Sequence, residues 1–455
     1  MTAGTLDESV KALAEGLRGH LLQPGSDGYE AARRVFNGMI DRRPALIASC
    51  RGPADVQASV AFARAHDLPV AVRGGGHNVA GHGTCDGGLL IDCSLMRSVR
   101  VDVSASTARA DPGCTWFDFD AETVAHGFAT TGGTVGSTGI AGLTLGGGLG
   151  FLMGRHGLTC DNLVSVDVVT AAAEFVTASR ESHPELFWGI RGGGGNFGVV
   201  TSFEFQLHPV DWLLGGLVVY PIEHARAALQ LFHETCATAP DELSCAFVLF
   251  TVPDGPRVAA IAACYDGPPS SGEALLDAIR RLGPPLEDGI RPMRYTDVQR
   301  IFAEIPFGLQ NFWKGQFLED MPAEVMDLTV ASFDAVTSDH SVVLIEAPHG
   351  AVRRLDGGET AFGQRNARYN ASALAIWEDP RDSERHISWA RGYADALTPF
   401  ASGGYVNYLA DDASREDVTA AYGPKRYQRL SALKTEYDPS NMFRFNQNIA
   451  PIGPE

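Results

Sequence analysis

The sequence lacks the features of several large protein classes. It has no run of about 18 apolar residues, so no membrane-spanning helix is predicted. It has only 36 basic residues against 55 acidic ones, and a net charge of −19 argues against binding to nucleic-acid phosphates. The N-terminus carries early acidic residues and no apolar block, so it does not read as a secretory signal. We therefore expect a soluble, cytoplasmic protein with no nucleic-acid and no membrane partner.

The cysteines have no spacing typical of a metal site, and the common nucleotide-binding motifs are absent or stand in the wrong context. The 8 cysteines are scattered without a CxxC pair, which is typical of reduced thiols in a cytosol. No GxxxxGK[ST] motif occurs. A GxGxxG spacing occurs at Gly193, Gly195 and Gly198, but a predicted helix precedes it and a predicted strand follows it. A nicotinamide-type Rossmann motif requires the opposite order, so that class is excluded.

The predicted elements of the N-terminal half alternate between strands and helices. Residues 45–50 form a predicted strand, a helix follows from Pro53, and 68–73 form a second strand. This βαβ unit predicts a sheet that is at least partly parallel. Thr115 is the predicted cap of a helix over 115–127. The spacing of Ser182 and Glu185 predicts a capping box for the helix "SHPELFWGIR".

Glycine is concentrated in three clusters, at 74–76, 130–152 and 192–198. The first cluster lies at the carboxyl end of a predicted strand, where open α/β sheets tend to bind ligands. Bare amides can form an anion-binding nest, and three clusters could wrap one long dinucleotide. Glycines also serve tight turns and close packing. That explanation is favoured for any single cluster, whereas three clusters in one strand-rich region favour the nest.

His77 directly follows the first glycine cluster. Together with His82 and Cys85 it makes an H-x4-H-x2-C spacing that loosely suggests zinc. A structural zinc site needs four ligands, and no second ligand pair is present, so no metal is predicted. The other interpretation from the residues alone is a loop histidine that is hydrogen-bonded to backbone.

Five separated segments, taken together, resemble a known family. They are "VAVRGGGHNVAGHGTCDGGLLIDCSLM", "GLTLGGGLGFLMGRHGLTCDNLVSVDVVTA", "HPELFWGIRGGGGNFGVVT", "GGYVNY" and "YDPSNMFRFNQNI". The sequence is similar in these segments, and in their order, to the berberine-bridge-enzyme-like oxidases of the p-cresol methylhydroxylase and vanillyl-alcohol oxidase superfamily. The resemblance implies an α+β fold: a two-part FAD-binding domain of the p-cresol methylhydroxylase type, plus an α+β substrate domain with an antiparallel sheet.

The resemblance also implies a division of the chain. An N-terminal helical segment would cover 1–35, the FAD-binding domain 36–210 and the substrate-binding domain 211–400. Residues 401–455 would return to the FAD domain. The polar, loop-like tail "YDPSNMFRFNQNIAP" fits a segment that returns to a ligand.

The cofactor that the resemblance implies is FAD, bonded covalently to His77 through its 8α-methyl carbon. Many relatives have a second tether, a cysteine, at the position of Val135, so a single linkage is expected here. Thr138 matches a position that controls oxygen access. The other implied cofactor contacts are Arg73, Gly74, Gly75, Gly76, Asn78, Gly81, His82, Gly136, Ser137, Gly142, Gly146, Gly147, Val200, Asn446 and Asn448.

The implied activity is an oxidase of secondary metabolism. It would oxidise an alcohol or amine carbon of a small organic molecule or natural-product intermediate, with hydride transfer to the flavin and O2 as acceptor. Candidates for the catalytic group are Tyr408, Tyr405, Asn407 and Glu346. The alternative for Tyr405 is core packing, and for Glu346 it is a buried, satisfied carboxylate or an edge position. Two rival functions are an NADPH-dependent flavin reductase on a related scaffold and a non-catalytic flavin-binding protein. A monomer or homodimer is expected.

Overall fold

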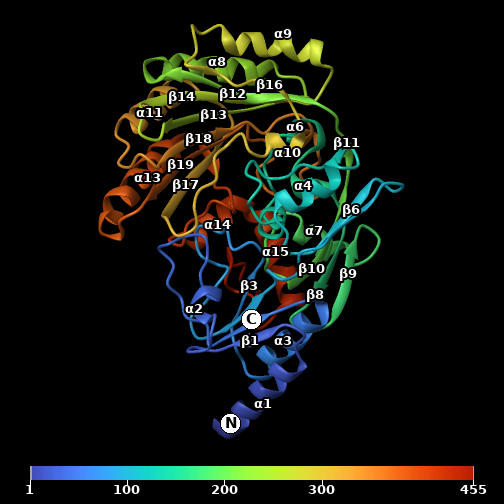
Figure 1. Cartoon of the computed structure of the whole chain (residues 1–455). Helices are drawn as coiled ribbons and strands as arrows, with labels where there is room; N and C mark the ends of the chain where they lie inside the picture. The colour runs from blue at the N-terminus through green and yellow to red at the C-terminus, as the bar shows by residue number, and fades with distance from the viewer. Residues whose placement is uncertain (1–2, 454–455) are drawn as a thin grey trace.

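A computed structural model describes residues 3–453. The first two residues of the expected segment 1–35 and the last two of the expected segment 401–455 therefore lie outside it. Figure 1 shows two small sheets in the lower half of the molecule and one large sheet in the upper half. The fold is α+β, as the family resemblance implies, and most of its strand pairs are antiparallel. No helix within residues 3–453 is long and apolar enough to cross a membrane.

The first small sheet contains the predicted βαβ unit. Its order is β1-β2-β4-β3, in which β2 and β3 both pair with β4 in parallel and β1 pairs with β2 antiparallel. Helix α3 begins at Pro53, a residue suited to a first helical turn. The elements are α1 (Ala3–Gly16), β1 (His20–Leu22), α2 (Tyr29–Ala32), β2 (Leu46–Ser49), α3 (Pro53–Ala65), β3 (Val70–Arg73) and β4 (Leu89–Asp92).

The second small sheet is antiparallel and has the order β5-β6-β10-β8-β9. Its strands are β5 (Val99–Asp102), β6 (Thr107–Ala110), β8 (Leu163–Val169), β9 (Phe175–Ser179) and β10 (Val199–Gln206), while β7 (Phe128–Ala129) pairs with β11 (His208–Pro209). The helices of this region are α4 (Trp116–Val124), α5 (Ile140–Leu145), α6 (Met153–His156), η1 (Thr159–Asn162) and α7 (Pro184–Ile190).

The two side-chain helix caps that the sequence predicts have different outcomes. Thr115 caps α4 in a reciprocal capping box with Asp118. The capping box predicted for Ser182 and Glu185 is wrong, because α7 begins after His183, which has a left-handed backbone and makes no side-chain cap. Pro184 starts that helix instead, since its missing N–H costs nothing in a first turn.

The upper sheet has nine strands, all antiparallel to their neighbours, in the order β15-β12-β14-β13-β18-β19-β17-β20, with β16 beside β12. The strands are β12 (Leu213–Pro221), β13 (Leu243–Thr251), β14 (Arg257–Tyr265), β15 (Glu287–Asp288), β16 (Arg291–Met293), β17 (Gln310–Leu318), β18 (Val342–Glu346), β19 (Tyr369–Trp377) and β20 (Ala401–Gly403).

Both faces of the upper sheet are apolar. Successive strand residues point to opposite faces, and apolar residues occupy both sets of positions. Phe247, Ile345 and Ala373 belong to the core shared with the covering helices, whereas Val248 and Leu344 belong to a cluster on the other face. Helices α8 and α9 lie on the outer side in Figure 1, and the other face is turned toward the two small sheets. The helices of this region are η2 (Ile222–His224), α8 (Ala225–Thr238), α9 (Pro269–Arg280), α10 (Tyr295–Val298), α11 (Ala323–Asp334), α12 (Ala351–Arg354), η3 (Pro380–Asp382), α13 (Ser383–Leu397) and η4 (Thr398–Phe400).

The C-terminal segment returns to the lower half through α14 (Arg415–Tyr422) and α15 (Pro424–Tyr437). Lys434, which is fully buried, is paired with Asp438 and donates to the carbonyls of Asn196 and Phe443. The Ile449 amide then donates to the side chain of Asn196. These bonds fasten the tail to the third glycine cluster.

Candidate active site

A cavity of about 1100 Å³ lies between the lower sheets and the inner face of the upper sheet. All three glycine clusters contribute to its lining, and so do residues 405–408 and the C-terminal tail. Ligand pockets are typically about 300–1,000 Å³, so this cavity has room for a large cofactor together with a substrate.

The first glycine cluster is held by the residue before it. The guanidinium of Arg73 forms a buried ion pair with Asp92, with Nη2 and Oδ2 2.6 Å apart, and donates to the carbonyls of Ala32 and Arg34. Arg73 and Asp92 also face each other across the parallel pair β3 and β4. The side chain of Arg73 is therefore used for folding, and the residue can serve a ligand only through its backbone.

Close packing explains the absence of side chains at several glycines. A Cβ on Gly75 would lie 2.6 Å from the Cα of Gly139, so the first two clusters touch backbone to backbone. Gly81, Gly136 and Gly147 have similar causes: an added Cβ would meet Ile40, Phe117 or Phe362 at 2.7 Å or less. At these positions packing within the protein is sufficient to require glycine.

At two other glycines, packing within the protein does not require glycine. A Cβ on Gly142 or Gly195 would meet no protein atom within 4 Å, and neither residue has a positive φ. Both line the cavity. Their bare backbone is therefore offered to the cavity rather than to a packing partner, as expected where a ligand approaches the main chain closely.

His77 lines the cavity and stacks on Phe36, with ring centroids 4.0 Å apart and an interplanar angle of 14°. Burial lowers the pKa of His77 to about 4 and lowers that of His82 to about 4. Both imidazoles are thus neutral at ordinary pH, and His77 retains a nucleophilic ring nitrogen. Among residues 3–453, no group of three or more His, Cys, Asp or Glu is arranged to hold a metal ion.

The position of the missing second tether also faces the cavity. Val135 and Thr138 line it, and the Thr138 amide donates to the carbonyl of Val135. Neither Cys114 nor Cys160 belongs to the lining. Cys93 does, but burial raises the pKa of its thiol well above the usual value, which keeps the sulfur protonated.

The upper wall of the cavity is a patch of apolar side chains. Neighbouring strands place Val248 opposite Leu344 and Trp313 opposite Leu374, and all four line the cavity. Arg73 is the one lysine or arginine among the described lining residues, and Asp92 neutralises it. This wall can hold an apolar body and has no free cation for an anionic group.

A polar corner lies next to this apolar wall. The hydroxyl of Tyr408, which lines the cavity, donates to Oε2 of Glu346 over 3.4 Å, and Asn370 donates to the same oxygen over 2.9 Å. Burial raises the pKa of Glu346 to about 7. Glu346 itself does not line the cavity, so it can reach a ligand only through Tyr408.

Tyr405 and Asn407 connect this region to the second glycine cluster. The Tyr405 hydroxyl oxygen accepts from the Gly148 amide at 3.0 Å and from Nδ2 of Asn407 at 2.9 Å. Nδ2 of Asn407 also donates to the carbonyl of Leu143. Gly146 packs against this amide, since a Cβ there would lie 2.0 Å from Oδ1 of Asn407.

Most residues predicted from the sequence meet at this cavity. The lining includes Arg73, Gly74, Gly75, Gly76, His77, Asn78, His82, Thr138, Gly142, Gly146, Val200, Tyr405, Asn407, Tyr408 and Asn446. It does not include Gly81, Gly136, Ser137, Gly147, Glu346 or Asn448. Contacts of this second group with a cofactor stay predictions.

The lining fits FAD. Nε2 of His82 and Oδ1 of Asn446 are buried without a hydrogen-bond partner, and both residues border the cavity. Buried polar atoms are nearly always satisfied, so two unpaired atoms beside an open glycine backbone favour a polar ligand of dinucleotide size. FAD would be held by residues 73–78, the second glycine cluster and the tail.

Sequence comparisons support this cofactor. Residues 44–179 match the family described as FAD binding domain, and residues 404–450 match berberine and berberine like. An FAD-linked oxidoreductase from Dictyostelium discoideum is 32% identical, covering 97% of this chain and 97% of its own length. (R)-6-hydroxynicotine oxidase from Paenarthrobacter nicotinovorans is 31% identical, covering 96% of this chain and 98% of its own.

Solved structures agree with the fold. That of 6-hydroxy-D-nicotine oxidase from Arthrobacter nicotinovorans has a TM-score of 0.87 at 30% identity, covering 96% of this chain and 98% of that one. A xylooligosaccharide oxidase from Myceliophthora thermophila has a TM-score of 0.86 at 22% identity, covering 99% and 100%, which shows a shared fold. Fold and site thus define an FAD-dependent oxidoreductase. The chain belongs to the berberine-bridge-enzyme-like family of the p-cresol methylhydroxylase superfamily.

Sequence reasoning missed three contributors to the site. Asp92 fixes Arg73, Asn370 bonds to Glu346, and Trp313 forms part of the apolar wall. Asp92 is the acid that ends β4, and β4 pairs in parallel with β3, the strand that ends at Arg73. Nothing in the local sequence marks Asn370 or Trp313, since their role depends on strand pairing.

Proposed function

We propose that this protein is an oxidase with FAD bound covalently through His77 in a single linkage. The observation that carries the proposal is a neutral imidazole at the cavity wall, directly after the glycine cluster and stacked on Phe36. The attachment needs an unprotonated ring nitrogen, which the lowered pKa supplies. Val135 offers no sulfur for a second bond.

The proposed substrate is a small, largely apolar organic molecule or natural-product intermediate, oxidised at a carbon that carries an alcohol or amine. The apolar wall around Leu344 and Leu374 favours such a molecule over a sugar, which would leave its hydroxyl groups without partners. This agrees better with the relative named 6-hydroxynicotine oxidase than with the structurally similar xylooligosaccharide oxidase.

FAD, when bound, supplies a hydride acceptor that is reoxidised by O2 to give hydrogen peroxide. Tyr408 takes the proton from the substrate hydroxyl or amine, while its own phenolic proton moves to Oε2 of Glu346. Asn370 holds that carboxylate in place. Tyr405 has both oxygen lone pairs occupied, so its hydrogen is free to bond to the ligand. Thr138 borders the cavity, where it can control the access of O2.

Acid precipitation of the purified protein tests the proposal. Yellow colour that stays in the pellet, and one FAD on the peptide that contains His77, is the expected result. Flavin released into the supernatant would contradict the linkage and favour the reductase or the flavin-binding protein. Peroxide formation from apolar amines and alcohols then identifies an oxidase, while flavin reduction by NADPH would identify the reductase.

A further inference from the structure

A buried ion pair lies beneath the second glycine cluster, outside the cavity. Arg365 and Asp161 form a two-pronged contact, with Nη1 and Oδ2 2.7 Å apart and Nη2 and Oδ1 2.6 Å apart. Their side chains are 4% and 9% exposed. Arg365 also donates to Oγ1 of Thr360 and to the carbonyl of Val352. Such a bidentate pair fixes direction as well as distance.

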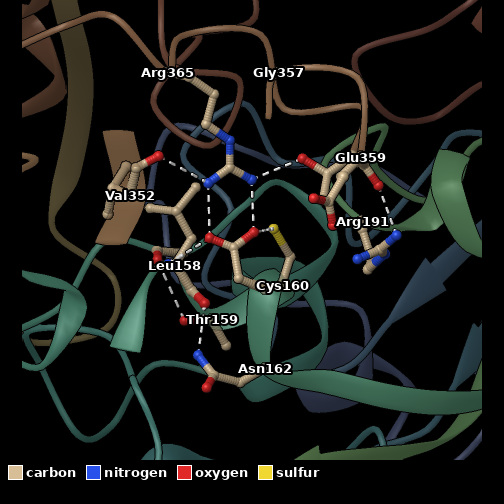
Figure 2. Close-up of polar contacts among 12 residues, drawn as sticks. Leu158, Thr159, Cys160, Asn162, Arg191, Val352, Gly357, Glu359 and Arg365 are labelled. Carbon is tan, nitrogen blue, oxygen red and sulfur yellow. Dashed lines mark hydrogen bonds and ion pairs between the residues drawn. The ribbon is translucent and has the colours of Figure 1, made fainter. Parts of the chain in front are cut away.

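Figure 2 shows the guanidinium of Arg365 facing the turn that carries Thr159 and Cys160, with Val352 beside it. This turn is η1, which also contains Asp161. The Cys160 amide donates to the carbonyl of Gly147 at 2.8 Å, and the Thr159 amide donates to that of Gly148 at 3.0 Å. The ion pair thus holds the element that fixes two consecutive glycine carbonyls.

The backbone turn at Gly147 and Gly148 contacts Tyr405. Gly147 and Gly148 have φ values of 120° and 88°, so the turn depends on neighbours that keep it in this conformation. The Gly148 amide donates to the Tyr405 hydroxyl oxygen. A chain of contacts therefore runs from Arg365 through Asp161 and η1 to the phenol that borders the cavity.

The segment that carries Arg365 also packs directly on the glycines. A Cβ on Gly147 would lie 2.7 Å from the ring of Phe362, and a Cβ on Gly192 would lie 2.4 Å from the Phe362 amide nitrogen. This segment connects α12 to β19, so it belongs to the chain that builds the upper sheet. It contacts the second and third glycine clusters through Phe362, which does not line the cavity.

We propose that Arg365 and Asp161 are positioning residues that set the direction of the Tyr405 hydroxyl through the Gly148 amide. This inference rests on the proposed function for the role of Tyr405 toward a bound ligand. Its test uses properties of the bound flavin that require neither turnover nor the covalent bond. The inference and the proposed function can therefore fail separately.

The test is a double-mutant cycle on the FAD-loaded protein. Asp161→Asn, Arg365→Met and Tyr405→Phe are made singly, and the first two are then combined with Tyr405→Phe. The readouts are the visible circular dichroism of the flavin and its midpoint reduction potential. Arg109→Met is the matched control, because Arg109 bridges Asp167 and Glu204 in the second sheet and does not border the cavity.

We expect Asp161→Asn and Arg365→Met to shift both readouts in the direction of Tyr405→Phe, and to add no further shift in the Tyr405→Phe background. Arg109→Met leaves both readouts unchanged even where it lowers the melting temperature. Arg365→Lys, which keeps the charge but not the planar fork, restores only part of the signal.

Three results would overturn the inference. These are unchanged readouts in both pair variants, shifts that add fully to that of Tyr405→Phe, and shifts in the pair variants when Tyr405→Phe has none. If Asp161→Asn and Arg365→Met do not fold, Arg365→Lys and its combination with Tyr405→Phe decide the same question.

Discussion

The lower and upper walls of the cavity are built on different principles. The lower wall presents backbone: bare glycines from three clusters, the first of which is held by a buried Arg73–Asp92 pair. The upper wall presents side chains from alternate positions of a sheet, including Val248, Leu344 and Leu374. A backbone wall tolerates few residue types, whereas a side-chain wall keeps its shape with many. A constant cofactor suits the first and a variable substrate suits the second.

Substitution of His77, in the lower wall, is expected to have the largest effect on flavin attachment. His77→Ala should lose all covalent flavin, because the proposed bond is made by the imidazole that directly follows the triglycine and not by His82, the neutral imidazole five residues further on. The measurement is the fraction of yellow colour in the acid pellet. His82→Ala is the matched control and should keep the flavin in the pellet. Covalent flavin in His77→Ala would contradict the assignment.

The polar corner is expected to carry the next largest effect. Tyr408→Phe should lower kcat by about 10²- to 10⁴-fold, the usual contribution of a proton-transferring group. Because the pKa of Glu346 is raised to about 7 and the ionised form accepts the proton, kcat should rise as pH increases through that value. Glu346→Gln should lower kcat and abolish the rise. A pH profile that is unchanged in Glu346→Gln would exclude this role.

Substitutions at two glycines of the lower wall distinguish a packing role from a ligand-binding role. Gly75→Ala forces a Cβ against Gly139 and should destabilise the apoprotein by about 1–3 kcal/mol. Gly142→Ala meets no protein atom, and alanine in helix α5 should stabilise the apoprotein by up to about 1 kcal/mol while FAD content falls. Melting curves and flavin content measure both. Normal FAD binding by Gly142→Ala would show that this glycine does not face the cofactor.

A substitution in the upper wall should have the smallest effect. Leu344→Met keeps the volume and apolar character of the wall and should cost less than about 1.5 kcal/mol of stability. Covalent flavin should be unchanged, and only the KM ratio among apolar substrates should shift. Loss of flavin from this variant would mean that the two walls are not independent.

Local patterns predicted the strands and the helix around the first glycine cluster, and the family resemblance implied the FAD. The run of strand, Arg73, triglycine and His77 is contiguous, so the sequence marks it as a candidate site, and the structure places it at the cavity. The bond from His77 to the flavin stays a prediction. The capping box at Ser182 failed because a left-handed His183 competes with it. Spacing alone also could not separate Gly142, which is open to the cavity, from Gly136, which packs on Phe117.

Contacts between distant residues were beyond prediction from the sequence. Tyr408 and Glu346 are 62 positions apart, and Asp161 and Arg365 are 204 apart. Each pair meets because of strand order or a packed loop, and neither residue of a pair carries a signal for the other. The apolar wall is likewise a product of register, since a shift of one residue would turn Leu344 to the helix-covered face.

The sequence by itself determined the lower wall, because bare backbone requires glycine and leaves a pattern that can be read along the chain. Only the tertiary structure decided which glycines face the cavity, which tyrosine reaches an acid and which side chains form the apolar wall. The physical reason is that these properties depend on the side chain opposite each residue, and antiparallel pairing and loop packing bring that neighbour from far away in the sequence.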